Sequence, residues 1–209
     1  DVSEAALRET ALALLAEYPR LRVHAVAGDF EKSIDHIPPG ARRLVLFIGG
    51  SIGNYTDPQA VRLLRRLRRC LHPDDHFLLG TDLVKSREEL RAAYNDAAGI
   101  TAAFNMNLLE VINRELGADF DLDRFEHIAL YNEEASQIEM YLRSSRRQTV
   151  RIPALSMRVS FEPEECILTE ISRKYTRESV EAILFRAGFR LKEWFTERDR
   201  FGTSLSTIA

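Results

Sequence analysis

The sequence predicts an α/β protein in which a partly parallel sheet, covered by helices, is interrupted by a lobe of short antiparallel strands. Residues 43–48 (RLVLFI) and 76–79 are continuous apolar runs, which are typical of parallel strands with both faces covered. A helical pattern separates the two runs, as in a parallel crossover. Beyond Lys85, short alternating segments follow one another, which indicates antiparallel strands.

The composition excludes several classes of protein. Of the 209 residues, 45% are hydrophobic and 29% charged, which is neither a disordered chain nor a disulfide scaffold. The net charge of −3 gives no electrostatic footprint for nucleic acid or an anionic membrane, and favours a small-molecule ligand. Cys70 and Cys166 have no metal or redox spacing, and no apolar run or leader indicates a membrane span or secretion. We therefore expect a cytoplasmic protein.

The first elements alternate between helix and strand. Residues 4–17 carry a helical stripe of apolar side chains, and residues 21–27 (LRVHAVA) alternate as a strand does before a turn at residues 28–30. The apolar strand at 43–48 stops at a glycine-rich segment. Thr56 or Asp57 then caps a helix that has a proline in its first turn and a stripe of arginines on its outer face.

The rest of the chain reads as a lobe followed by a return to the sheet. Helical patterns cover residues 88–104 and 108–116. The strands predicted to follow are 128–131, 137–143, 149–152, 155–161 and 167–174. A helix at 176–187 and strands at 189–196 and 202–208 complete the chain. We expect residues 1–85 and 175–209 to form the sheet domain and residues 86–174 an inserted lobe.

Three polar clusters follow predicted strands or begin the chain, where ligands bind in open α/β sheets. Asp1 is interpreted either as a helix N-cap or as an acceptor for ribose hydroxyls. Asp29 and Phe30 fit an adenine pocket, but Gly-Asp is equally a common turn. The third cluster, residues 49–54 (GGSIGN), lacks the lysine of a phosphate loop. Its first residue, Gly49, permits close backbone approach to a ligand, whereas Asn54 is either a turn residue or a ligand contact.

Other candidate chemistry is weaker. The histidines are scattered without ligand spacing, so we expect no metal; they are His24, His36, His72, His76 and His127. Glu170 and Ser172 lie two apart on a strand and share a face, which is either a solvated face or a grip on a polar ring. Met140 is expected in the core.

Several longer motifs make the sequence familiar. They are GDF at 28–30, SIGN at 51–54, GTDLVK at 80–85, YND at 94–96, GITAAFN at 99–105 and IEM at 138–140. Together they resemble the histidine-specific Nα-methyltransferases of ergothioneine biosynthesis, which transfer three methyl groups from S-adenosylmethionine to the α-amine of free histidine and give hercynine. The resemblance implies a Rossmann-like class I methyltransferase sheet with an inserted α+β antiparallel substrate lobe, S-adenosyl-L-methionine as co-substrate and L-histidine as substrate.

The resemblance also assigns roles on the cofactor side. It implies that Asp1 binds the ribose, that Asp29 and Phe30 bind the adenine, and that Gly49 belongs to the cofactor-binding set.

On the substrate side, the resemblance implies that Asn54 and Tyr94, the catalytic candidates, hold the amino and carboxylate end of the amino acid. It also implies that Met140 lines the imidazole pocket and that Glu170 and Ser172 bind the ring. A carboxylate and a hydroxyl can address both nitrogens of an imidazole, whereas an indole offers one N–H.

The chain departs from the family pattern at its beginning. The family's first strand with its glycine-rich cofactor loop, and a segment with further substrate-binding tyrosines, are expected before Asp1, so the chain corresponds to the C-terminal two-thirds of such an enzyme. Two other hypotheses stay open: a homologue that methylates another amino acid such as tryptophan, and an inactive fragment that serves as an interaction module. The sequence does not give the oligomeric state.

Overall fold

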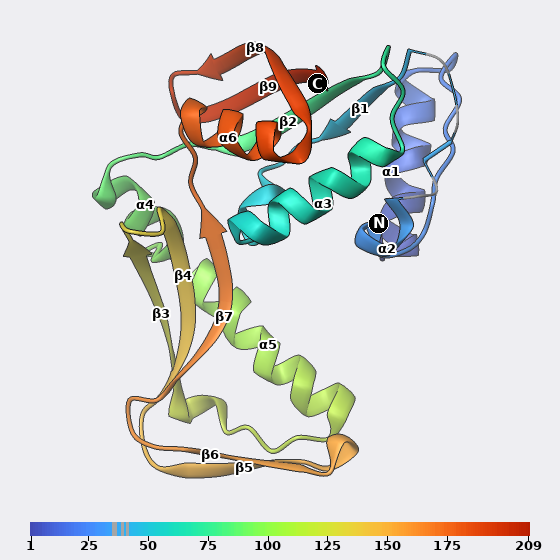
Figure 1. The fold of residues 1–209 in the computed structure, drawn as a ribbon. Helices are drawn as coiled ribbons and strands as arrows, with labels where there is room; N and C mark the ends of the chain where they lie inside the picture. The colour runs from blue at the N-terminus through green and yellow to red at the C-terminus, as the bar shows by residue number, and fades with distance from the viewer. Residues whose placement is uncertain (35–36, 39, 41) are drawn as a thin grey trace.

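A computed structural model of the chain describes residues 1–34, 37–38, 40 and 42–209. The molecule has two parts (Figure 1): an upper part with a four-stranded sheet, and a lower part with a long helix beside a three-stranded sheet. His36 lies outside the described residues. Among the described residues, no helix is both long and apolar enough to cross a bilayer.

The upper sheet combines one parallel and two antiparallel pairings. Its strands, in spatial order, are β1 (Leu44–Phe47), β2 (His76–Asp82), β9 (Phe201–Ile208) and β8 (Phe189–Glu197). β1 and β2 are parallel, and the helix α3 (Asp57–Arg69) connects them. The predicted parallel crossover is therefore confirmed, as are the two closing strands.

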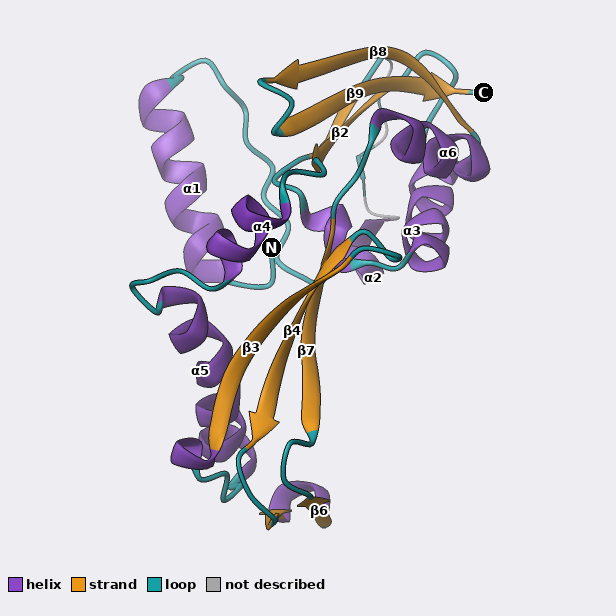
Figure 2. Ribbon diagram, turned by 90° about the vertical axis from the view of Figure 1, so that its left-hand side faces the viewer, coloured by secondary structure: helices purple, strands orange, loops and turns teal. Residues whose placement is uncertain are grey.

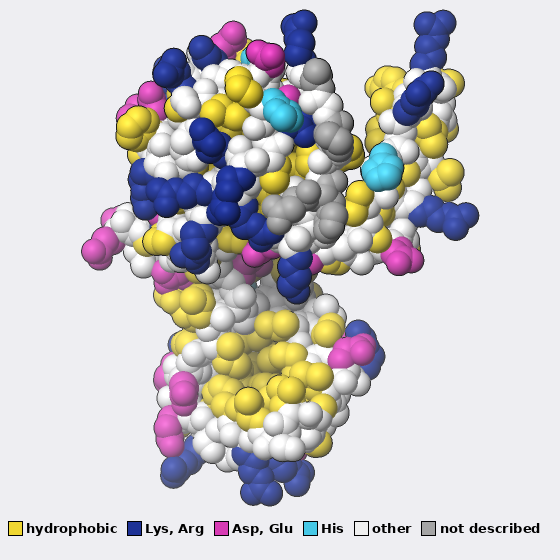
Figure 3. All heavy atoms as spheres, turned by 45° about the vertical axis from the view of Figure 1, so that its right-hand side comes forward, with side chains coloured by type: hydrophobic (Ala, Val, Ile, Leu, Met, Phe, Trp, Pro, Cys, Tyr) yellow, Lys and Arg dark blue, Asp and Glu magenta, His cyan; other side chains and the backbone are white. Residues whose placement is uncertain are grey.

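The core of the upper part lies between this sheet and two helices, α3 and α6 (Arg177–Ala187), which pack on each other. Thr56 precedes α3 as its N-cap, with Pro58 in the first turn, as expected. Leu64 and Phe77 are almost fully buried there, and each such side chain contributes about 1.5–3 kcal/mol of transfer free energy. Figure 3 shows Lys and Arg side chains gathered on the outside of the upper part.

The expectation that both faces of β1 are covered is wrong. Val45 and Phe47 pack against the core, but Leu44 and Leu46 on the opposite face are 56% and 53% exposed. Within the described residues, no strand pairs with the other edge of β1. One face of this apolar strand is therefore exposed, and one of its edges is unpaired within the described residues.

The predicted strand at 21–27 is also wrong. These residues, all of them described, have no regular secondary structure. The helix before them, α1 (Glu4–Glu17), forms as predicted, yet none of its described residues is buried. The turn that follows meets the start of the chain, because the Gly28 amide donates to the Asp1 carbonyl at 2.8 Å. A strand needs a hydrogen-bonded neighbour, and no strand among the described residues pairs with this segment.

The lower part is built on the antiparallel sheet β3 (Phe125–Asn132), β4 (Gln137–Ser144) and β7 (Cys166–Arg173), in that order. The helix α5 (Ile100–Leu116) packs on β3 and β4 (Figure 2). A separate hairpin joins β5 and β6, with bounds Gln148–Ile152 and Met157–Phe161. The predicted lobe strands are thus present, although the one expected from residue 155 begins at Met157 after a short 3₁₀ turn.

The helix predicted over 88–104 is divided into α4 (Arg87–Tyr94) and α5. Asp96 causes the division, since its carboxylate accepts hydrogen bonds from the Ile100 and Thr101 amides at 2.9 and 2.8 Å and starts a new helix. The break ends α4 at Tyr94, which matters for the site described next.

Candidate active site

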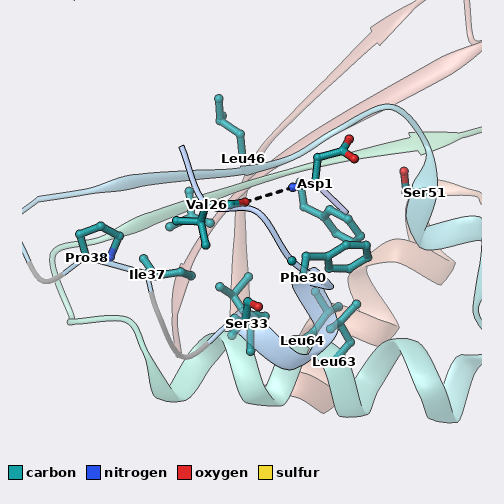
Figure 4. Close-up of a pocket in the computed structure, with 15 residues that line it drawn as sticks. Asp1, Val26, Phe30, Ser33, Ile37, Pro38, Leu46, Ser51, Leu63 and Leu64 are labelled. Atoms are coloured by element: carbon teal, nitrogen blue, oxygen red, sulfur yellow. Dashed lines mark hydrogen bonds between the residues drawn. The ribbon is translucent and has the colours of Figure 1, made fainter. Parts of the chain in front are cut away.

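A largely apolar pocket of about 560 Å³ lies beside β1 (Figure 4). Val26, Phe47 and Leu63 are among its lining side chains, and Asp1, Phe30 and Ser51 line it as well. The Phe30 and Phe47 rings are 5.6 Å apart between centroids. The pocket therefore combines an apolar interior with the carboxylate of Asp1 and the hydroxyls of Ser33 and Ser51.

The structure places Asp1 and Phe30 in this pocket but not Asp29 or Gly49. The Asp29 carboxylate caps the short helix α2 (Phe30–Ser33) by accepting from the Glu31 amide at 2.9 Å. Gly49 is exposed, with φ of 85°. Two of the four predicted cofactor residues are thus brought together. Asp29 stands between the lining residues Gly28 and Phe30, and Gly49 stands two residues from Phe47 and from Ser51.

The N-cap interpretation of Asp1 is wrong. Ser3 caps α1, since its hydroxyl accepts from the Ala6 amide at 3.3 Å. The Asp1 carboxylate accepts from the Ser3 amide at 2.8 Å and is otherwise exposed at the pocket.

A second cluster forms where the lobe joins the sheet. The Tyr94 hydroxyl, at the end of α4, donates to the Ser172 hydroxyl on β7 at 2.9 Å. The Lys174 ammonium donates to both hydroxyls, at 2.8 and 2.9 Å. Two of the predicted substrate residues are therefore in direct contact, although 78 positions separate them in the chain.

Lys174 is the residue that the sequence interpretation missed. It is 2% exposed and lies 2.8 Å from the Asp82 carboxylate at the end of β2. Its ammonium also lies 4.8 Å from the centre of the Tyr94 ring, which is cation–π distance. A signal was present, because Glu170, Ser172 and Lys174 alternate along one predicted strand.

The electrostatics of the cluster centre on this lysine. Burial raises the pKa of Asp82, but hydrogen bonds from Lys174 and Lys85 outweigh it and hold that pKa below its ordinary value. Burial raises the pKa of Glu170, and the charge of Lys174 opposes the rise. The cluster thus pairs a buried cation with one ionised carboxylate and lies near a second carboxylate that is half-buried.

Met140 and Glu170 are directly opposite each other on β4 and β7. Met140 is buried, as expected, in a small apolar cluster against which Tyr94 packs. Glu170 and Ser172 are both half-buried, so their face is partly shielded from solvent.

The loop after β1 reaches the same place. It forms a 3₁₀ turn, η2 (Ser51–Asn54), that packs on β7. An added Cβ at Gly53 would lie 2.9 Å from the Arg173 carbonyl and 3.7 Å from the Ser172 hydroxyl. Asn54 is the next residue and is exposed. The predicted substrate residues Asn54, Tyr94, Met140, Glu170 and Ser172 therefore belong to one region, built from η2, α4, β4 and β7.

His127, on β3, contacts the main chain of Tyr94 and so helps to hold this region in place. Its Nε2 lies 2.9 Å from the Tyr94 carbonyl and its Nδ1 lies 2.9 Å from the amide nitrogen of Asn105. An amide N–H₂ can only donate, so Nδ1 accepts from Asn105 and Nε2 donates to the Tyr94 carbonyl. This histidine is structural, as expected. Among the described residues, no three His, Cys, Asp or Glu side chains are grouped as metal ligands.

The comparisons with known proteins bear on this arrangement. A family model described as "Histidine-specific methyltransferase, SAM-dependent" matches residues 1–207. The histidine N-alpha-methyltransferases of Mycolicibacterium smegmatis and Mycobacterium tuberculosis are 49% and 46% identical to the chain over 99% of its length. The chain spans 64% of the length of each. The L-tryptophan methyltransferase of Psilocybe serbica is 28% identical over 82% of the chain and 48% of its own length.

Solved structures agree on the fold. An S-adenosylmethionine-dependent methyltransferase from Clostridium acetobutylicum has a TM-score of 0.50, with 12% identity over the whole chain and 73% of its own. The CcbJ methyltransferase from Streptomyces caelestis has a TM-score of 0.52, with 14% identity over the whole chain and 78% of its own. At these identities the likeness shows the fold alone, which is the α/β fold of such methyltransferases.

Proposed function

Because the chain belongs to the histidine-specific, SAM-dependent methyltransferase family, we propose that its protein transfers methyl groups from S-adenosylmethionine to the α-amine of L-histidine, giving hercynine in ergothioneine biosynthesis. The observation that carries the proposal is the contact of Tyr94 with Ser172, beside Glu170 on the same strand. This arrangement supports the proposal, because a carboxylate and a hydroxyl on one face of a strand can offer an imidazole an acceptor and a donor.

The pocket beside β1 suits the adenosyl part of S-adenosylmethionine. Its apolar lining and the Phe30 ring offer contact to a flat base, and the Asp1 carboxylate can accept from ribose hydroxyls. In the proposal Asp29 accepts from the adenine amine, and the glycine at 49 permits close backbone approach. S-adenosylmethionine supplies the electrophilic methyl group when bound.

The residues of the lobe would bind and orient the amino acid. Asn54 and Tyr94 hold its amino and carboxylate end, Met140 forms a wall of the pocket, and Glu170 and Ser172 bind the ring. The attacking amine must be neutral, so catalysis comes mainly from holding it in line with the transferred methyl, an effect worth several kcal/mol. The proposal keeps residues 1–85 with 175–209 as the methyltransferase domain and residues 86–174 as the substrate lobe.

The proposed setting is the cytoplasm, with a small-molecule substrate and neither nucleic acid nor membrane as partner. The net charge of −3 supports the absence of a nucleic-acid or membrane partner, since the chain has no excess of positive charge for a polyanion. The proposal includes no metal.

Tryptophan is the second candidate substrate, supported by the 28% identity to a tryptophan methyltransferase. Glu170 argues against it, because an indole has a single N–H and leaves either the carboxylate or the hydroxyl without a partner. The third hypothesis is a non-catalytic interaction module, which would bind neither S-adenosylmethionine nor an amino acid.

A competition assay tests all three. The full-length protein is incubated with S-adenosylmethionine and equal amounts of histidine, tryptophan, tyrosine and phenylalanine, and the methylated products are identified by mass spectrometry. We expect trimethylated histidine as the dominant product. A preference for tryptophan would replace the substrate assignment, and an absence of both product and binding in calorimetry would favour the interaction module.

A further inference from the structure

The Lys174 ammonium contacts side chains from three elements, β2, α4 and β7. Two of these contacts are with the hydroxyls of the proposed substrate site, Tyr94 and Ser172. We propose that Lys174 is a positioning residue that fixes the hydroxyl hydrogens of Tyr94 and Ser172, so that Ser172 acts as a hydrogen-bond donor to the substrate ring. The inference rests on the proposed function and deepens it, because it specifies which protonation state of the imidazole the site selects.

The hydrogens of Lys174 are all used. An ammonium has three N–H donors and no acceptor. Three oxygens surround it at hydrogen-bonding distance: Asp82 Oδ2 at 2.8 Å, Tyr94 Oη at 2.8 Å and Ser172 Oγ at 2.9 Å. With its side chain wholly inaccessible to solvent, the ammonium has these three acceptors as its partners, and both hydroxyl oxygens therefore accept from it.

These contacts determine which of the two hydroxyls, Tyr94 or Ser172, donates to the other. Tyr94 accepts from Lys174 and donates its own hydrogen to Ser172 at 2.9 Å. Ser172 then accepts two hydrogen bonds, which occupy both of its lone pairs. Its remaining hydrogen must point away from Lys174 and Tyr94. Ser172 thus offers a substrate one hydroxyl donor and no free acceptor.

Glu170 supplies the complement. It lies two residues before Ser172 on β7, so both side chains leave the same face of the strand. An ionised carboxylate is an acceptor only. One donor and one acceptor match a neutral imidazole, which has one bare nitrogen and one N–H. An imidazolium has two N–H groups and would leave the Ser172 hydrogen facing a second donor.

A purely structural role for Lys174 makes a different prediction. Asp82 and Lys174 link the sheet to the lobe, and Asp82 also holds Lys85. Asp82→Asn removes the negative charge from this link but keeps an oxygen that accepts from Lys174. It therefore weakens the link and leaves the hydroxyl orientation intact, which makes it the matched control.

The variant experiment compares two amino acids of similar shape in the full-length protein. β-(2-Thienyl)-L-alanine carries a five-membered ring without the imidazole's donor and acceptor. We expect the wild-type kcat/KM for histidine to exceed that for thienylalanine by at least about 100-fold. Lys174→Met should lower this ratio of the two kcat/KM values by about 10-fold or more. Lys174→Arg, which keeps a cationic donor, should restore part of the ratio. Asp82→Asn should keep the ratio while lowering Tm.

A measurement on the unaltered protein covers the case in which Lys174→Met does not fold. ¹⁵N NMR of ring-labelled histidine bound to the full-length protein should show a neutral ring with one bare nitrogen at pH values where free histidine is partly protonated. A bound imidazolium overturns the inference, as does a Lys174→Met protein that loses activity equally on both amino acids. A wild type that does not favour histidine overturns the proposed function instead, so the two failures are distinguishable.

Discussion

The main chain of Gly53 lies directly against the main chain of Arg173: a Cβ at Gly53 would come within 2.9 Å of the Arg173 carbonyl oxygen and 3.3 Å of its nitrogen. The turn η2 and the strand β7 therefore meet backbone to backbone. The contact brings together the two chain segments that carry Asn54, which follows Gly53, and Ser172, which precedes Arg173. One glycine thus brings the loop after the parallel strand to the substrate lobe.

Gly53→Ala should separate these two elements. The new methyl group collides with backbone atoms, which cannot rotate away, so we expect a loss of about 1–3 kcal/mol in unfolding free energy and a lower methylation rate. Urea denaturation and steady-state kinetics measure the two effects. Gly40→Ala is the matched control, because among the described residues its methyl group would meet the flexible Arg43 side chain, at 3.4 Å, and no backbone atom. Equal stability of Gly53→Ala and the control would contradict the close contact.

Tyr94→Phe and Asn54→Ala should lower the methylation rate of the full-length protein but leave S-adenosylmethionine binding nearly intact. Tyr94→Phe removes the hydroxyl that contacts both Ser172 and Lys174, and the loss of such a charge-assisted hydrogen bond corresponds to about 10- to 150-fold in rate. Tyr131→Phe, a half-buried tyrosine of the same apolar cluster, is the control. An equal loss of cofactor affinity and rate would assign Asn54 and Tyr94 to the cofactor pocket instead.

The Asp29 carboxylate should contribute to cofactor binding apart from its role as a helix cap. Asp29→Ala in the full-length protein removes both the cap of α2 and the proposed acceptor for the adenine amine, and we expect S-adenosylmethionine binding to weaken about 10- to 150-fold in titration calorimetry. Asp29→Ser separates the two roles, because serine is also a good N-cap. Recovery of wild-type affinity in Asp29→Ser would leave Asp29 with the capping role alone.

Asp75 should make the stability of the sheet depend on acid pH. Its buried carboxylate accepts hydrogen bonds from the Arg43 side chain and from the Arg43 and His72 amides, and these contacts hold its pKa well below the ordinary value. A depressed pKa stabilises the fold above the unfolded-state pKa of about 3.9, and this contribution is lost as the pH falls toward the folded-state value. Asp75→Asn should therefore lower Tm at pH 7, and its deficit should shrink between about pH 5 and 2. A deficit that does not change with pH would exclude this linkage.

The sequence predicted elements whose partners lie close in the chain. The parallel pair β1 and β2, the cap at Thr56 and the lobe strands have local patterns that survive in the structure. The strand at 21–27 failed because an alternating pattern becomes a strand only beside a hydrogen-bonded neighbour, and periodicity does not report whether one is there. The break before α5 was missed because the Asp96 carboxylate binds the first two amides of α5, and Gly99 is the N-cap, inside an otherwise helical pattern.

For the site as well, the sequence predicted what a local pattern contains and missed the contacts between separate elements. The shared face of Glu170 and Ser172 follows from their spacing, but the contact of Tyr94 with Ser172 joins residues on separate elements, which no local pattern contains. Lys174 was passed over because lysines are rarely fully buried. A buried, fully paired lysine on the same face as two candidate ligands is informative only once the fold is known.

Substrate identity depends most on Glu170. Burial raises the pKa of this carboxylate, so it is costly to hold ionised unless a partner donates to it, and an imidazole N–H is such a donor. Glu170→Ala should raise the KM for histidine sharply and relax the rejection of bulkier aromatic amino acids, tryptophan above all, because the space of the carboxylate is opened and its demand for a donor is removed. Glu170→Gln keeps the size and should retain the rejection of tryptophan better than alanine does. Methylated products of the full-length variants, measured by mass spectrometry in competition between histidine and tryptophan, give the ratios. If Glu170→Ala keeps full histidine selectivity, the carboxylate does not bind the ring, and the assignment of histidine as the substrate loses its structural support.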